Sequence, residues 1–225
     1  MTKSQMSDWK RWCVLILLST AMAWMEAATV VYLRTLVDRL DPYQPLPLPL
    51  FGDLLHTEVL REAATLALLG SAAWLAGATA RERFACFLVL FGTWDLLYYV
   101  FLACIGPWPR SVWDWDVLFL IPLPWWGPVI APVAIAILML LAGTLATQAR
   151  PGVWPRPRAW LSATAGASCA LTVFMRDALA ATGGGAAVGE LQPTHFEWPL
   201  FLVGLTLMAV PLADLIRQLV FARRR

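Results

Sequence analysis

Six apolar runs, each close to the length that a helix needs to cross a bilayer, constrain this chain more than any other feature. A membrane-spanning helix takes about 20 predominantly apolar residues. In lipid the backbone must satisfy its own hydrogen bonds, so such runs are expected to be helical. The runs cover residues 12–37, 59–80, 84–105, 128–147, 159–175 and 198–222. The sequence therefore predicts an all-α, polytopic membrane helical bundle with about six transmembrane helices.

The composition leads to the same fold class. Of the 225 residues, 60% are hydrophobic and 14% are charged, whereas soluble domains average about 25% charged residues. The length suits one integral membrane domain over residues 1–225, with no separate soluble domain. The net charge of +2 is too small to indicate nucleic-acid binding. The partner that the composition predicts is the lipid bilayer, and no nucleic acid is expected.

The basic residues predict an orientation. If the N-terminus is inside, twelve of the seventeen basic residues lie on the inner side, among them Lys10, Arg81, Arg158 and Arg223. The outer side then holds Arg34, Arg39, Arg61, Arg110 and Arg176. Because cytoplasmic loops carry an excess of Lys and Arg, both termini are expected in the cytoplasm. The predicted location is the cell inner (cytoplasmic) membrane, which the chain crosses several times.

The segment 113–127 does not fit a regular transmembrane helix. Its apolar stretch 117–121 is too short to span a bilayer, and Pro122, Pro124 and Pro128 then interrupt regular helix. We expect a re-entrant or interfacial segment on the outer side, before the fourth span. Non-helical backbone at membrane depth is tolerated where it is buried in protein or lines a wet cavity. The alternative is a loop lying on the surface, with its tryptophans at the membrane interface.

Two acidic residues stand within the apolar runs. Glu26 is the only charge between Cys13 and Leu33, and Asp95 is the only charge in residues 84–105. A carboxylate at membrane depth costs roughly 2.5–3.5 kcal/mol on insertion scales, so an intramembrane carboxylate is a functional-site hypothesis. At a rise of 1.5 Å per residue, Glu26 lies roughly 21 Å from the inner edge and Asp95 roughly 16 Å. Both therefore fall at or beyond the midplane, toward the outside.

Other polar residues are expected near the same outer region. Tyr98 and Tyr99 follow Asp95 by three and four residues, so they share its helix face. Arg34 or Arg61 could neutralise Glu26 or Glu62. The candidate ligand-binding or proton-relay residues are Glu26, Asp95, Tyr98, Tyr99, Glu62, Asp116, Arg34 and Arg61. The alternative is that these groups form ion pairs and hydrogen bonds that hold the helices together.

Metal and cofactor chemistry has little support in the sequence. The two histidines, His56 and His195, lie in outer loops, and no CxxC, HxxxH or ExxH motif occurs. Nucleotide-binding and acyl-hydrolase motifs are absent as well. The four cysteines lie in apolar runs, where they are expected to pack as small hydrophobic residues. We therefore expect no metal site and no cofactor, and we assign no catalytic residue.

Two stretches carry a resemblance. FGTWDLLYYVFL and WDVLFLIPLPWWGPVIAPV, in the middle third of the chain, resemble bacterial multi-pass membrane proteins. The resemblance implies no particular activity.

Three functions are compatible with these patterns. The first is an outward-facing acidic intramembrane pocket that binds a small cation, a proton or a polar solute, as in a transporter. The second is an accessory or structural subunit of a larger membrane complex, with other membrane-protein subunits as partners. The third is a membrane enzyme acting on a lipid-like substrate at the outer interface, which requires Asp114, Asp116, His56 or His195 to converge with Glu26 and Asp95.

Overall fold

A computed structural model of the chain describes residues 8–36, 55–149, 152–184 and 195–223. These residues form long helices and one two-stranded β-hairpin. In chain order the elements are α1 (Asp8–Leu36), α2 (Leu55–Ala76), α3 (Ala80–Ile105), β1 (Trp115–Phe119), β2 (Trp125–Pro128), α4 (Ile130–Gln148), α5 (Pro157–Gly184), α6 (Trp198–Met208) and α7 (Val210–Arg223).

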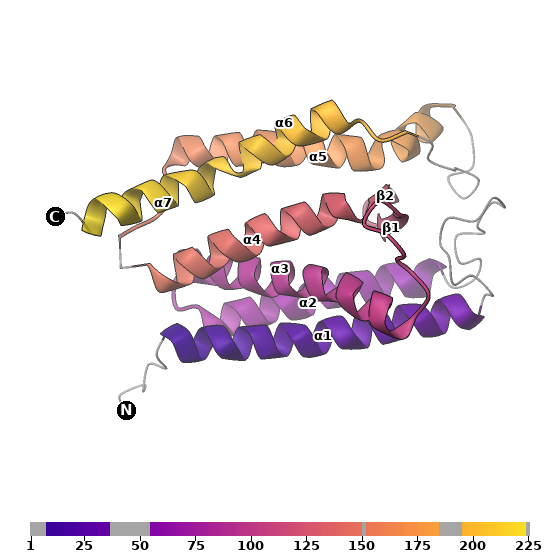
Figure 1. Ribbon diagram of the computed structural model, residues 1–225, viewed down its shortest axis with the longest axis horizontal. Coiled ribbons are helices and arrows are strands. Elements are labelled where there is room, and N and C mark those ends of the chain that lie inside the picture. Colours follow the sequence, from indigo (N-terminus) through magenta and orange to yellow (C-terminus); the bar gives the residue numbers. More distant parts are fainter. Residues whose placement is uncertain (1–7, 37–54, 150–151, 185–194, 224–225) are drawn as a thin grey trace.

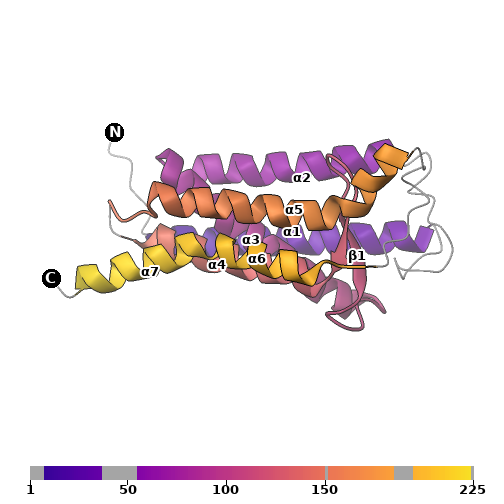
Figure 2. The ribbon, with the colours of Figure 1, turned by 90° about the horizontal axis from the view of Figure 1, so that it is seen from above.

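The helices lie side by side along the longest axis of the molecule (Figure 1). The start of α1, the α2–α3 turn, the start of α5 and the end of α7 lie together, and we call this the terminal end. The end of α3, the hairpin and the start of α4 lie at the opposite end, which we call the hairpin end. Figure 2 shows the hairpin running across the direction of the helices.

The apolar helices agree with the predicted membrane helical bundle. Among the described residues, five helices are long and apolar enough to cross a membrane: α1, α2, α3, α4 and Trp198–Phe221, which takes α6 and α7 together. α5 covers the predicted fifth span but is not one of the five. It is richer in hydroxyl side chains, and Thr164, Ser168 and Thr172 each donate a hydrogen bond to the carbonyl four residues earlier.

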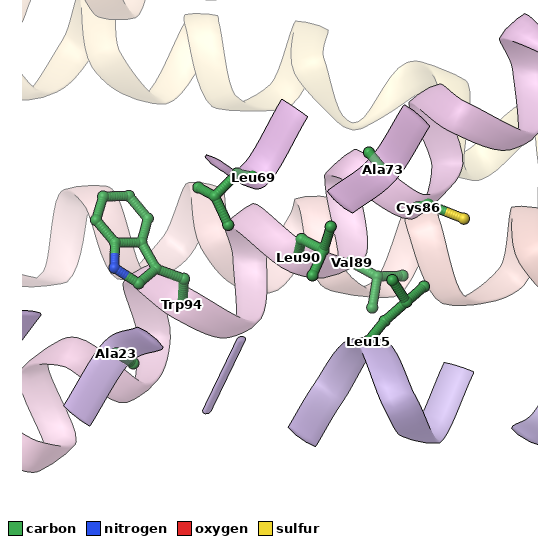
Figure 3. Close-up of a cluster of buried hydrophobic side chains, with 8 residues drawn as sticks. All are labelled: Leu15, Ala23, Leu69, Ala73, Cys86, Val89, Leu90 and Trp94. Atoms are coloured by element: carbon green, nitrogen blue, oxygen red, sulfur yellow. The ribbon is translucent and has the colours of Figure 1, made fainter. Parts of the chain in front are cut away.

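α3 is the central helix of the first four. It packs against α1, α2 and α4, whereas α5 packs mainly on α6 and α7. The largest of the three shared clusters joins α1, α2 and α3, with Leu15, Leu69, Leu90 and Trp94 among its buried members (Figure 3). Within it, the Ser19 hydroxyl donates to the carbonyl of Leu90, so a polar side chain of α1 is satisfied by the backbone of α3.

Glycines allow close helix contacts at two interfaces. A Cβ at Gly92 of α3 would lie 2.6 Å from the carbonyl oxygen of Ala136 in α4, and one at Gly143 of α4 would lie 2.8 Å from that of Ala85. At the α5–α6 interface, a Cβ at Gly166 would clash with the carbonyl oxygen of Gly204. Small residues at helix–helix contacts are typical of membrane bundles, because they let the backbones approach closely.

The segment 113–127 differs from the sequence prediction in containing β-structure within a fold predicted to be all-α. β1 and β2 pair antiparallel, with Asp116 opposite Gly127. Pro122 and Pro124 fall in the turn, and Pro128 ends β2, where a missing N–H is tolerated. A Cβ at Gly127 would lie 3.1 Å from the rings of Phe174 and Phe196. The hairpin therefore packs directly against α5 and the segment that leads into α6.

Candidate functional site

One charged cluster joins α1 to α2 toward the hairpin end. The Arg61 guanidinium forms an ion pair with Glu26 of α1 and a second one with Glu58, one turn earlier on α2. Its Nε lies 2.8 Å from Oε2 of Glu58. Thr65 lies on the same face and its hydroxyl is 3.5 Å from the Glu26 carboxylate. The pairing of Arg61 with Glu26, one of those expected from the sequence, is present.

A second charged cluster joins α1, α3 and the hairpin. Asp116 of β1 is 2% exposed and accepts a hydrogen bond of 3.0 Å from the Arg34 guanidinium. Its other oxygen accepts one of 3.2 Å from the Tyr99 hydroxyl. The Arg34 guanidinium also lies 4.4 Å from the centre of the Trp108 ring, a favourable cation–π distance. Burial raises the pKa of Asp116 above its ordinary value, while the Arg34 charge and the Tyr99 hydroxyl act in the opposite direction.

Glu62 has a structural partner of a different kind. Its carboxylate accepts a hydrogen bond of 2.9 Å from the backbone N–H of Leu120, just after β1. Glu62 is 7% exposed, so this bond satisfies a buried amide of the hairpin that has no strand partner at that point. Glu62 therefore ties α2 to the hairpin, much as Asp116 ties the hairpin to α1 and α3.

Asp95 is the exception among these acidic residues. It is mostly buried, and its carboxylate has no hydrogen bond or ion pair to any residue in the described ranges. The charge that acts on it is the like charge of Asp116. Tyr98, one turn further along α3, lies within electrostatic range of Asp116 and Arg34, and of Glu26 and Arg61. Both charged clusters thus act electrostatically on Tyr98.

The predicted site residues are therefore divided between four settings. Glu26 and Arg61 belong to the α1–α2 cluster, while Arg34, Tyr99 and Asp116 belong to the α1–α3–hairpin cluster. Glu62 caps the hairpin amide. Asp95 is within electrostatic range of the second cluster, whereas the charges that act on Glu26 are those of Arg61 and Glu58.

Three contributors were not predicted. Glu58 could have been found, because it precedes Arg61 by three residues and so shares its helix face. Thr65 follows Arg61 by four residues and gives the same signal. Trp108 follows α3 in a proline-containing loop, and no pattern in the sequence places it beneath Arg34.

His56 was expected in a loop but lies exposed in the first turn of α2, while His195 and the remaining loop acids lie in other surroundings. His195 Nε2 is 3.6 Å from the carboxylate of Glu197, which also pairs with Arg176. Asp114 accepts hydrogen bonds from the backbone N–H groups of Arg110 and Ser111. In the part of the chain that the structure describes, no group of three or more His, Cys, Asp or Glu residues is arranged to hold a metal ion.

Comparisons with known proteins add no functional information. No protein-family model matches the chain, and neither a curated protein nor a solved structure shows significant similarity to it.

Proposed function

We propose that this protein binds a proton or a small cation at Asp95, within a membrane-embedded helical bundle, as a transporter of that ion or of a solute coupled to it. One observation carries the proposal. Glu26, Glu58, Glu62 and Asp116 all have polar partners, whereas the Asp95 carboxylate has none among the described residues. A mostly buried carboxylate in an apolar helix is costly, and binding a proton or a cation removes that cost.

The surroundings of Asp95 support this assignment. Tyr98 and Tyr99 lie one turn further toward the hairpin end, and the Tyr99 hydroxyl is already hydrogen-bonded to Asp116. Two tyrosines and a second carboxylate, Asp116, thus lie on the hairpin side of Asp95. Ionisable residues within membrane helices commonly mark proton and ion pathways.

We also propose a location and an orientation for the bundle. The excess of basic residues at the terminal end favours both termini in the cytoplasm of a bacterial cell. The bundle would then lie in the inner membrane, with α5 as the fifth of six spans and the hairpin as a re-entrant element in the outer half. Asp95 would be reached from the outside.

The reactivity of the Asp95 carboxyl group tests the proposal. Dicyclohexylcarbodiimide modifies carboxyl groups that are protonated in apolar surroundings, and peptide mass spectrometry locates the adduct. We expect the purified protein to be modified at Asp95, with labelling that declines as the pH rises. A bound cation would also slow labelling when sodium or potassium replaces choline in the buffer.

Matched variants make the result specific. Asp95→Asn should abolish the adduct and, in proteoliposomes, the ion or solute flux, while the nearly isosteric amide preserves the fold. Glu26, whose carboxylate is paired with Arg61, serves as an internal control and should remain unmodified. Absence of labelling at Asp95 in the folded protein, or equal labelling of Glu26, would refute the assignment.

A second candidate function, a subunit of a larger membrane complex, is favoured by one feature of α5. This helix exposes Thr164, Ser168 and Thr172 along one side, and small hydroxyl residues are enriched where membrane helices associate. Replacing Thr164 and Ser168 by leucine should then reduce the mass of the assembly extracted in mild detergent. Leu171→Ile, on the same helix, is the control and should leave the mass of the assembly unchanged. If the leucine variant also keeps the mass of the unmodified protein, the α5 face does not have this role.

A further inference from the structure

An aromatic cluster joins the starts of α3 and α5 at the terminal end. The rings of Trp154 and Trp160 are stacked, with centroids 5.5 Å apart. Phe84, in the first turns of α3, meets both tryptophans edge-on, at 5.3 Å from Trp160 and 6.4 Å from Trp154. The cluster brings the α2–α3 turn and the segment before α5 together, although about 70 residues separate them in the sequence.

Three arginines lie close to this cluster along the chain. The guanidinium of Arg81, three residues before Phe84, lies 6.0 Å from the centre of the Trp154 ring. Arg156 and Arg158 stand between the two tryptophans in the sequence, and all three arginine residues are exposed. Phe84 packs on both tryptophans, and this contact brings the segment that carries Arg81 next to the segment that carries Arg156 and Arg158. The three arginines therefore lie at the same end of the bundle.

Their charge is poorly compensated within the described ranges. Arg81 and Arg158 form no ion pair there, and Arg156 has a single distant one, 3.9 Å from Asp214. Asp214 is already engaged by the Arg156 backbone N–H and the Gln218 amide. The acid nearest in sequence to Arg81 is Glu82, which is held by Arg11 and by a backbone N–H. The arginines therefore present surplus positive charge.

Apolar side chains begin immediately beside the arginines. Phe84 is 40% exposed and Leu161, the residue after Trp160, is 71% exposed. Arginine binds phosphate oxygens with paired N–H donors, and basic clusters next to membrane helices attract anionic lipid headgroups. Inorganic phosphate would contact the arginines but not the exposed apolar surface, whereas a phospholipid would contact both.

We propose that Arg81, Arg156 and Arg158, arranged around Phe84, Trp154 and Trp160, bind the headgroup of an anionic phospholipid whose acyl chains lie along Phe84 and Leu161. The site lies at the opposite end of the bundle from the hairpin (Figure 1) and uses none of the residues around Asp95. Its existence is therefore independent of ion binding at Asp95.

Lipid retention by the purified protein tests the site. Phosphatidylglycerol, phosphatidylcholine or inorganic phosphate is added to protein in neutral detergent, and bound lipid and thermal unfolding are measured by native mass spectrometry and by a melting curve. We expect phosphatidylglycerol to be retained and to raise Tm, and the other two to do neither. Neutralising Arg81 and Arg158 by glutamine should weaken retention by about fivefold for each arginine.

The controls decide the outcome. Arg110→Gln removes an exposed arginine at the hairpin end and should leave retention unchanged. Equal binding of phosphatidylcholine, equal protection by free phosphate, or undiminished retention in the Arg81→Gln/Arg158→Gln variant would each overturn the proposal. If that variant does not fold, Arg81→Lys/Arg158→Lys keeps the charge, and its retention of phosphatidylglycerol should fall as salt is raised. Retention insensitive to salt would overturn it as well.

Discussion

At the residue scale, the charged groups of the apolar helices differ in whether they have partners. Arg61 holds Glu26 and Glu58 together, so two carboxylates and one cation share an interface between α1 and α2. Removing one partner from a buried ion pair is more damaging than removing both, because the remaining charge loses its compensation. The stability of this interface should therefore depend on Arg61 more than on either carboxylate.

Arg61→Gln is expected to destabilise the protein by up to about 3 kcal/mol, because Glu26 and Glu58 would remain as unpaired buried carboxylates. The double variant Glu26→Gln/Arg61→Gln should recover part of that loss. The free energies of unfolding of the single and double variants are measured in mixed micelles by circular dichroism. A double variant as unstable as the sum of the two single variants would show that Arg61 and Glu26 are not energetically coupled.

The sequence could identify these residues but not their pairing. Glu26 and Asp95 are conspicuous as lone charges in apolar runs, and Arg34 and Arg61 are the candidates for neutralising Glu26 or Glu62. The structure pairs Arg61 with Glu26 and Arg34 with Asp116. This choice depends on how α1 and α2 are rotated about their axes and on where the hairpin lies, neither of which follows from spacing along a single helix.

At the element scale, the helices were predictable and the hairpin was not. Runs of about 20 apolar residues have one structural solution in lipid, and the described bounds of α1, α3 and α4 lie close to the predicted runs. β1 and β2 are only five and four residues long and are separated by prolines. Their stability comes from contacts distant in sequence, such as the Glu62 carboxylate on the Leu120 amide. Such contacts leave no local pattern.

The α3–α4 contact gives a prediction with a control inside the same chain. Gly143→Ala would place a methyl group 2.8 Å from two backbone atoms of α3, so we expect a loss of about 1–3 kcal/mol of stability. Gly70 of α2 has nothing within 4 Å of the added carbon. Gly70→Ala should therefore be neutral or stabilise by up to about 1 kcal/mol through helix propensity. Chemical unfolding of both variants distinguishes them, and equal effects would contradict close packing at Gly143.

At the scale of the whole molecule, the arrangement of the helices decides which groups can act together. α1, α2 and α4 pack around α3. α5 to α7 join these four helices through β2 and through contacts with α4. This grouping brings residues from α1, α3 and the hairpin to one end and the surplus arginines to the other. The number and length of the apolar runs could not reveal it, because many arrangements of the same helices bury similar apolar surface.

The two ends of the bundle differ in charge, and this difference predicts the orientation of the molecule in a membrane. The excess of basic residues at the terminal end predicts that this end faces the cytoplasm. In a variant whose four native cysteines are replaced by alanine, Ser111→Cys introduces an exposed thiol between α3 and the hairpin, and Ala78→Cys one in the α2–α3 turn. In right-side-out membrane vesicles, a membrane-impermeant maleimide should label Ser111→Cys at once and Ala78→Cys only after detergent is added. The reverse pattern would place the termini outside, and the route to Asp95 would then open to the cytoplasm instead.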